Sequence, residues 1–462
     1  MDSPVAIENG YKKCMSWRWG IPNLIPFLIP PNKKKFLRNY NSLLQEEDMA
    51  SLSEEMEIEV LSRLPVKSLL RFQTICKPMY RLIRDPAFVK KHIEHAIQNG
   101  TSTFLMFQYF MPTRMEMNGF YSIDHTSLSS QLLSSIRGNP LRDSTEMAYP
   151  VVPPDYLKLL GSCYGLVCLR TTEPGNEDSI CLGNPSTKEY KKLPDSPNHF
   201  SSSTEGIEIG LCGLGYDDKA NDFKVIRVAE IDSRADCFDD SSNWSETEIR
   251  TIRPRSGHVE VSTRRSQSVF EIYSLRSNSW KGLKTTPYYF PGELKPGVMV
   301  NGFMHWWAIN RIAGYEAIIY FDLSDEIFKE VAVLEGPMLH DGEVADSEYE
   351  NNNVGVLGGC LCVLHKTFDR VDVWVMQEYG VKESWTKRFT TTEDSIIETS
   401  TLRVISDFQD GSILFSTDDS LVYYDPNRKR GTRKLRIPGT GRLKGAEKCI
   451  GSLVSLGSGT YC

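Results

Sequence analysis

The chain has 462 residues, more than one hydrophobic core usually organises, so we expect more than one structural unit. Hydrophobic residues make up 40% and charged residues 24%, as in ordinary folded proteins. The formal net charge of -7 argues against a globally basic nucleic-acid-binding protein. Eleven scattered cysteines, with no recognisable secretory signal, favour reduced thiols and a cytoplasmic or nuclear protein.

Residues 1–48 lack a pattern typical of a folded element. The most apolar stretch, "IPNLIPFLIPP" at residues 21–31, is far short of the about 20 residues that span a membrane. Its four prolines would also break a helix. We therefore expect a poorly ordered extension and no membrane partner.

Residues 52–95 have the spacing of short helices. Apolar residues at 56, 60, 61 and 64 share one helical face, and Pro65 ends that helix. A second helix carries Leu69 and Phe72. Pro78 suits the first turn of a third helix, and Asp85-Pro86 is an N-cap followed by a first-turn proline. We predict three or four short helices.

These helices carry more large apolar side chains than so small a unit needs. Six of them, buried against a partner at roughly 1.5 to 3 kcal/mol each, would contribute about 9 to 18 kcal/mol before association costs. The same side chains could instead fill a core shared with the rest of the chain. Composition leaves a core and a docking surface as equal alternatives.

The stretch "LSEEMEIEVLSRLPVKSLLRFQTICKPMYRLIRDPAFVKKH" resembles the F-box, which binds the Skp-type adaptor of an SCF ubiquitin ligase. Ser53 and Met79 stand where the family usually has Pro and Trp. We expect adaptor binding to be retained, and whether these two residues weaken it stays open. The residues that the resemblance assigns to adaptor contact are Leu52, Met56, Val60, Leu61, Leu64, Pro65, Leu69, Phe72, Cys76, Met79, Tyr80, Leu82 and Ile83.

Beyond about residue 100, short alternating apolar runs are separated by Gly, Pro, Asn and Asp, which predicts antiparallel strands and tight turns. A glycine phrase recurs near residues 161, 215, 302, 359 and 411, with a period of about 50 residues and one longer interval. A second phrase places an aromatic residue after a turn, and we expect these aromatics to pack between units: Tyr190, Trp280, Phe328 and Trp385. The pattern predicts a kelch-like β-propeller, with a β-sandwich as the alternative.

The phrases "GSCYGLVCL", "NPSTKEYKKLP", "GLGYDDKANDFKV" and "VNGFMHWWA" also resemble the F-box-associated domain of plant S-locus F-box and F-box/kelch-like receptors. The chain is thus predicted to combine a small α domain with an all-β domain. The predicted divisions are an extension at 1–48, an F-box at 49–95, a connecting segment with the first strands at 96–150, the propeller-like domain at 151–445 and a tail at 446–462.

We find no motif that supplies chemistry. The glycine-rich stretches lack the spacing of a phosphate loop, and no nucleophile elbow surrounds Cys163. The pairs Cys163/Cys168 and Cys360/Cys362 lack a second pair for zinc. His92 and His95 are too few for a metal site. We expect no catalytic residue, metal or cofactor.

Target binding is expected on loops of the β domain. The insertion 231–268 has an acidic front half and a basic back half, in which Arg250, Arg253 and Arg255 are candidate contacts. A second acidic loop is Asp341–Asn353; either loop could instead be flexible and have no partner. Trp306 and Trp307 are adjacent, so we expect one between blades and the other at a surface pocket.

These features predict the substrate receptor of a cullin-RING ubiquitin ligase. The F-box would bind a Skp-type adaptor, and through it the cullin and RING subunits, while the β domain holds a target protein. Two alternatives are an interaction scaffold with a degenerate F-box and, by analogy with kelch-fold oxidases, a propeller enzyme.

Overall fold

The computed structural model describes residues 54–100, 102–111, 117–133, 140–141, 143–147, 156–172, 178–198, 207–232, 248–255, 258–290, 296–333, 352–428, 431–437 and 440–457. The predicted extension, Leu52, Ser53, the acidic front half of the insertion after residue 232 and most of the second acidic loop lie outside these residues.

The predicted helices are confirmed. They are α4 (Glu54–Leu61), α5 (Val66–Phe72), α6 (Lys77–Ile83) and α7 (Pro86–Asn99), together called the helical module here. Pro65 precedes α5, Pro78 lies in the first turn of α6, and the Asp85 carboxylate accepts from the backbone N–H groups of Ala87 and Phe88. The proline and N-cap signals thus mark the helix boundaries.

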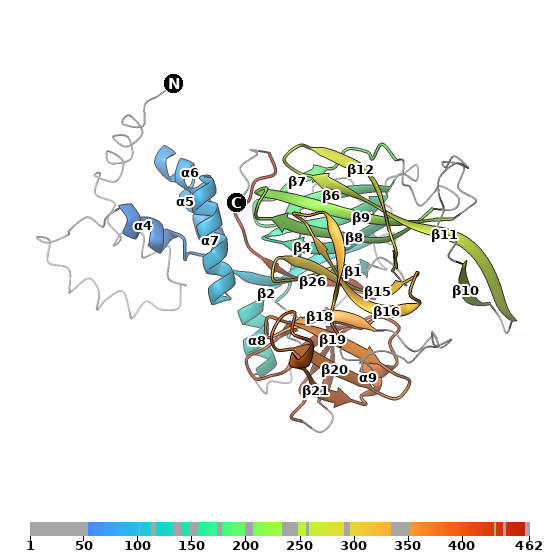
Figure 1. The fold of residues 1–462 in the computed structure, drawn as a ribbon. Helices are drawn as coiled ribbons and strands as arrows, with labels where there is room; N and C mark the ends of the chain where they lie inside the picture. The colour runs from blue at the N-terminus through green and yellow to red at the C-terminus, as the bar shows by residue number, and fades with distance from the viewer. Residues whose placement is uncertain are drawn as a thin grey trace, which may run out of the picture.

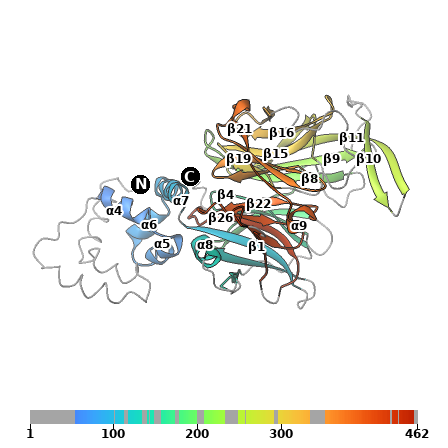
Figure 2. The same ribbon diagram turned by 90° about the horizontal axis from the view of Figure 1, so that it is seen from below.

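The described strands form six sheets, which are the blades of a propeller (Figures 1 and 2). Blade 1 contains β26 (Leu443–Ile450), β1 (Thr103–Met111), β2 (Met117–Asp124) and β3 (Thr145–Met147). Blade 2 contains β4 (Tyr156–Cys163), β5 (Leu166–Thr172), β6 (Asp178–Asn184) and β7 (Glu189–Lys192). Blade 3 contains β8 (Ile207–Asp217), β9 (Asp222–Asp232), β10 (Glu248–Arg255), β11 (His258–Ser274) and β12 (Ser279–Thr286).

The remaining blades follow in chain order. Blade 4 contains β13 (Tyr288–Tyr289), β14 (Val298–Val300), β15 (Phe303–Asn310), β16 (Tyr315–Asp322) and β17 (Ile327–Val331). Blade 5 contains β18 (Asn353–Leu357), β19 (Cys360–Lys366), β20 (Val371–Met376) and β21 (Trp385–Thr391). Blade 6 contains β22 (Arg403–Asp407), β23 (Ile413–Ser416), β24 (Leu421–Tyr424) and β25 (Thr432–Leu435). Three short helices, α8 (His125–Leu133), η1 (Lys382–Ser384) and α9 (Asp394–Ile397), lie in the connections.

The two ends of the β domain meet in blade 1. Strand β26 pairs antiparallel with β1, from Thr103 opposite Ile450 to Tyr109 opposite Leu443. The propeller therefore begins at residue 103, within the segment that we predicted to contain a connection and the first strands. The boundary predicted at 445/446 falls inside β26, so the expected tail is partly the closing strand.

Aromatic residues after the outer turns join neighbouring blades, as predicted. The Trp280 indole donates to the Pro194 carbonyl at 2.7 Å, and the Trp385 indole donates to the Ala332 carbonyl at 3.0 Å. Each bond links the outermost strand of one blade to the end of the preceding blade. The glycine repeat is less regular than expected, because Gly161 and Gly215 lie within strands and not in turns.

The propeller has two faces because its strands alternate in direction. The helical face carries the junction of α7 with β1, the turn at residues 164–165 and the end of β26. The far face carries the opposite turns, at residues 311–314, 367–370 and 417–420. The β10–β11 hairpin extends on the far face, at the opposite end of the molecule from the helical module (Figures 1 and 2).

His305 on β15 predicts a pH dependence of propeller stability. Its ring is fully buried: Nε2 lies 2.7 Å from the Tyr379 hydroxyl, and Nδ1 lies 3.1 Å from the Phe303 carbonyl. The neutral ring satisfies both contacts, with the tyrosine donating and Nδ1–H donating. Burial lowers the pKa of His305 to about 4 and raises the pKa of Tyr379 to about 12.

We expect the full stabilising effect of the neutral His305 ring on the folded chain above pH 6.5. Between pH 6.5 and about 4, the unfolded chain binds a proton at His305 that the folded chain excludes. The free energy of unfolding should fall by up to about 3 kcal/mol over that window. Denaturant titrations of the wild-type chain and of His305→Gln at pH 7, 6 and 5 measure it. Equal slopes with pH in both proteins would refute this role of His305.

Candidate interaction surfaces

The helical module exposes large apolar side chains. Met56 is 56% exposed, and Val60, Ile75 and Tyr80 are also exposed. Leu64, Cys76 and Leu82 are half-buried beside the module's core, and Pro65 is exposed. Exposed apolar groups in a set are typical of interaction sites, whereas single ones are common everywhere. We call Met56, Val60, Ile75 and Tyr80 the module surface.

Other residues predicted to contact the adaptor are packed inside the chain. Leu61, Leu69, Phe72 and Ile83 are buried, and Met79 is 8% exposed. They belong to a hydrophobic cluster that continues into blade 2. The predicted set therefore divides into an exposed group and a buried group. The buried group fills a core shared with the rest of the chain, and adaptor contact by the exposed group stays a prediction. At position 79 the departure from the family pattern affects the core.

Basic residues surround part of the module surface. Lys67, Arg71, Lys77, Arg81 and Arg84 on or beside α5 and α6 are exposed. The Arg84 guanidinium lies 4.9 Å from the centre of the Tyr80 ring. Positive charge beside exposed apolar side chains favours a partner whose surface combines acidic and apolar groups.

Acidic Glu59 is paired within the module. Its carboxylate lies 2.5 Å from the Lys91 ammonium and 3.4 Å from the His95 ring. The hydrogen bond from Lys91 lowers the pKa of Glu59, as does its pairing with Arg63. The pairs with Lys91 and His95 join α4 to α7.

The insertion at residues 231–268, predicted to be a loop, contains regular structure on the far face. Its back half is a two-stranded ribbon, in which Arg250 lies opposite Thr263, Arg253 opposite Glu260 and Arg255 opposite His258. Strand β10 pairs only with β11 among the described strands. The ribbon extends β11 beyond the end of β9, because β9 and β11 pair only as far as Asp232 and Ser266.

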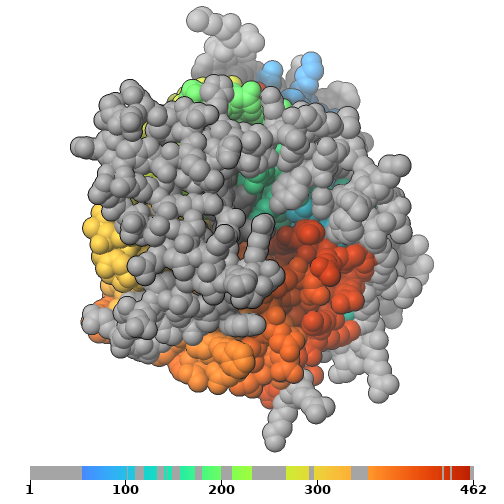
Figure 3. Space-filling model, turned by 90° about the vertical axis from the view of Figure 1, so that its right-hand side faces the viewer, coloured from blue at the N-terminus to red at the C-terminus, as the bar shows by residue number. Residues whose placement is uncertain are grey.

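Two hydrophobic side chains at turns also mark the far face. Ile312, between β15 and β16, is 76% exposed, and Phe368, between β19 and β20, is 74% exposed. They are the most exposed large hydrophobic residues in the described part of the chain. Figure 3 looks onto this face, with atoms of blades 4 to 6 in yellow, orange and red.

Neither predicted tryptophan lines a surface pocket. Trp306 is buried in the cluster between blades 3 and 4, and Trp307 in the cluster between blades 4 and 5. They do point to opposite faces of β15, but a propeller sheet is covered by a neighbour on each side. The expectation that one of them reaches the surface was therefore wrong.

The described residues offer little for covalent or metal chemistry. They contain no group of three metal-ligating side chains, and their cysteines are free. Hydrogen bonding to Cys212, together with burial, raises the pKa of the Cys168 thiol well above its ordinary value. Burial likewise raises the pKa of Cys362, which disfavours the nucleophilic thiolate at both positions. No helix in the described ranges is long and apolar enough to cross a membrane.

Comparison with known families agrees with this architecture. Residues 113–444 match the F-box associated beta propeller domain. The chain belongs to the F-box-associated β-propeller family. Residues 49–91 match the F-box domain, so the helical module is an F-box. The propeller is the substrate-binding type of domain that accompanies an F-box in this family.

Relatives with the same two parts occur in Arabidopsis thaliana. The F-box protein CPR1 is 28% identical over 426 residues, which cover 88% of this chain and 89% of the relative. The F-box protein At4g22390 is 25% identical, covering 76% of each chain. The F-box/kelch-repeat protein At3g23880 is 25% identical, covering 83% of this chain and 93% of the relative. The kelch-like assignment made from the repeat pattern is thus supported by relatives of this F-box-associated β-propeller protein.

Sequence reasoning missed one segment that joins the F-box to the propeller. Residues 451–457 run from the end of β26 between the two domains, and Leu453, Val454 and Leu456 are buried there. The stretch "GSLVSLG" does carry a signal, since three large apolar residues in seven are unusual for a solvated tail.

Proposed function

We propose that this protein is the substrate receptor of a cullin-RING ubiquitin ligase. The observation that carries the proposal is the module surface on the F-box, where four large apolar side chains are exposed: Met56, Val60, Ile75 and Tyr80. The Skp-type adaptor is the partner that an F-box implies. Through it the chain would join a cullin and a RING subunit.

The charge around that surface supports an acidic adaptor. Exposed Arg71, Lys77 and Arg81 would lie near the rim of the contact, where charge mainly accelerates association. Apolar burial at the centre would supply most of the affinity. Binding is therefore expected to weaken moderately with salt and to persist at physiological ionic strength.

Target binding is assigned to the far face. This face points away from the F-box, so an occupied adaptor leaves it accessible (Figures 1 and 2). The β10–β11 ribbon and the exposed Ile312 and Phe368 supply contact area there. The rate effect would come from proximity, because a held target presents its lysines at high effective concentration to the ubiquitin-charged enzyme.

In this proposal the chain itself makes and breaks no bond. The high pKa values of Cys168 and Cys362 argue against a thioester intermediate at either position. Neither a cofactor nor a nucleic-acid or membrane partner is required. The protein would act in the cytoplasm, the nucleus or both, where the free buried cysteines stay reduced.

Reconstitution tests the proposal. The purified chain, a Skp-type adaptor, a cullin with its RING subunit and the ubiquitin-activating and ubiquitin-conjugating enzymes are combined. We expect co-elution of the receptor with the adaptor and cullin, and ubiquitin transfer to the receptor itself, which is the nearest protein. A receptor that remains separate would instead favour the scaffold alternative, in which the F-box serves only as a packing unit.

A further inference from the structure

The segment after β26 lies between the F-box and blade 2. We call residues 451–457 the strap. On the F-box side, the Gly451 N–H donates to the Ser102 carbonyl at 2.7 Å, immediately after α7. A Cβ on Gly451 would lie 3.3 Å from the Val66 side chain, so the strap passes close against α5. Leu453 and Val454 share one buried cluster with Leu61 and Leu69 of the F-box.

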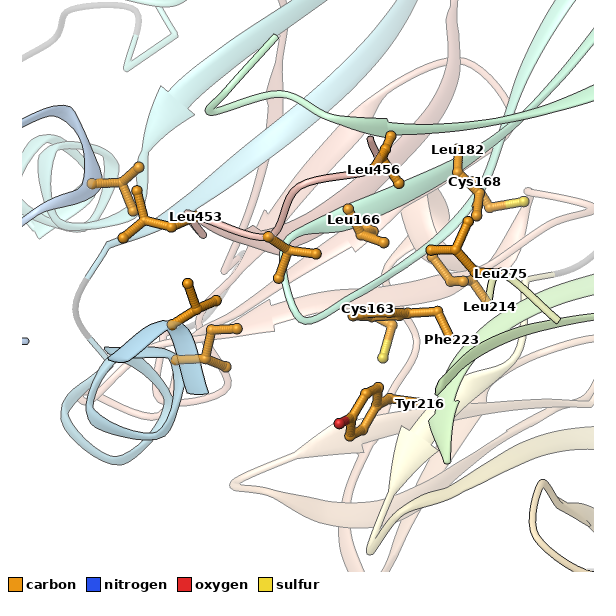
Figure 4. Close-up of a cluster of buried hydrophobic side chains, with 14 of the residues drawn as sticks. Cys163, Leu166, Cys168, Leu182, Leu214, Tyr216, Phe223, Leu275, Leu453 and Leu456 are labelled. Carbon is orange, nitrogen blue, oxygen red and sulfur yellow. The ribbon is translucent and has the colours of Figure 1, made fainter. Parts of the chain in front are cut away.

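Blade 2 holds the other side of the strap through two polar residues, the buried Asn184 and the partly exposed Glu189. The Asn184 side-chain amide donates to the Val454 carbonyl at 2.8 Å and to the Ser452 carbonyl at 3.1 Å. The Glu189 carboxylate accepts from the Leu456 N–H at 2.7 Å and from the Ser455 hydroxyl at 2.8 Å. Figure 4 shows Leu456 beside Leu166 and Leu182 of blade 2, with Leu453 on the side of the helices.

An ion pair outside the strap also joins the F-box to blade 2. The Arg84 guanidinium and the Glu189 carboxylate are 3.9 Å apart, and both side chains are partly exposed. An ion pair of this kind contributes about 0 to 1 kcal/mol. Domains in one chain move relative to each other unless the interface between them is extensive and apolar. The strap contributes to the apolar part, since its buried Leu453, Val454 and Leu456 belong to the hydrophobic cluster that contains residues of both domains.

We propose that the strap is a positioning element that fixes the orientation of the F-box on the propeller. It would thereby set where the far face stands relative to the bound adaptor. Its importance for ubiquitin transfer rests on the proposed function, but its effect on domain orientation does not. Asn184 is the positioning residue at its centre, because one fully buried amide holds two backbone carbonyl groups of the strap, those of Ser452 and Val454.

The substitution Asn184→Asp tests the proposal with little change of shape. The side-chain oxygen that accepts from the Ser186 N–H at 2.9 Å is kept, so the local turn remains bonded. The donors to the strap are lost, and a carboxylate then faces two carbonyl oxygens. Asn427→Asp, at an exposed position in the β24–β25 turn, is the control with the same charge change. A chain ending at Ile450 removes the strap, and one ending at Gly457 is its matched control.

The readout is the distance distribution between probes at exposed Lys90 on α7 and exposed Asp218 on blade 3, measured by fluorescence transfer on the isolated full chain. We expect one narrow distribution in the wild-type chain and both controls. It should be lost in Asn184→Asp and in the chain ending at Ile450, while the propeller unfolds at nearly its usual denaturant concentration. If the chain ending at Ile450 fails to fold, the distance distribution of Asn184→Asp alone tests the proposal.

An unchanged narrow distribution in Asn184→Asp would overturn the proposal. The assembled ligase adds a second readout, in which the strap variants bind adaptor normally but transfer ubiquitin more slowly per bound complex. If a strap variant has a broadened distance distribution but transfers ubiquitin at the wild-type rate, the strap does not position the target for transfer. Its role would then be structural only. Because the distances are measured without adaptor, failure of adaptor binding would count against the proposed function alone.

Discussion

A chain that ends at Arg442, and so lacks β26, is expected to fail to form a closed propeller. Strand β26 is the innermost strand of blade 1 and pairs with β1 along its length. Leu443, Ala446 and Cys449 on β26 are each buried. Removing it would open the ring between blades 6 and 2 and leave β1 with an unpaired edge, a known cause of aggregation.

The expected loss of folding free energy in the chain that lacks β26 is comparable to the total stability of a domain. Burial of Leu443 alone contributes about 1.5 to 3 kcal/mol, and the paired backbone adds to it, against a total stability of about 5 to 15 kcal/mol. Size-exclusion chromatography and far-ultraviolet circular dichroism would show aggregated or poorly structured protein. The chain ending at Gly457 should elute as wild type. A soluble monomer with unchanged thermal unfolding from the chain ending at Arg442 would contradict the closure described here.

The second large effect is expected from Met56→Asp combined with Val60→Asp on the module surface. Both side chains are exposed, so the F-box should stay folded. If the adaptor buries both, the loss of apolar burial alone is about 3 to 6 kcal/mol, or roughly 10² to 10⁴ in affinity. Titration calorimetry with purified adaptor measures the change. Ile327→Asp, an exposed apolar position on the propeller, is the control and should bind normally.

Buried F-box residues would give a misleading version of this test. Leu61→Asp places a charge in the cluster shared by the F-box, the strap and blade 2, and is expected to unfold the F-box. Loss of adaptor binding by Leu61→Asp would therefore not show that Leu61 contacts the adaptor. Undiminished binding by the Met56/Val60 double variant would show that the adaptor uses another part of the F-box.

The F-box could be predicted from sequence in detail because its signals are local. Pro65, Pro78 and the Asp85-Pro86 pair each act within one helical turn, and all three mark helix boundaries in the structure. The propeller could be predicted as a class, since the turn-aromatic phrase recurs in successive blades. Its closure by β26 could not, because the pairing of Thr103 with Ile450 joins residues from opposite ends of the domain.

The candidate contacts were harder to predict than the fold. Strand alternation correctly separates Trp306 from Trp307, but only the radial arrangement shows that both sides of β15 are covered. Helical spacing likewise groups Leu61 with Met56 and Val60, although Leu61 is buried in the hydrophobic cluster and the other two are exposed. Periodicity identifies which residues share a face. It does not say whether the chain itself or a partner covers that face.

Direct titration of the wild-type chain with a purified Skp-type adaptor tests the central claim most directly. We expect a one-to-one complex at micromolar concentration or below, with affinity that falls moderately as salt rises because exposed basic residues lie on the same helices as Tyr80. Absence of heat and of co-elution at micromolar concentrations, with a chain whose F-box and propeller are folded, would contradict it.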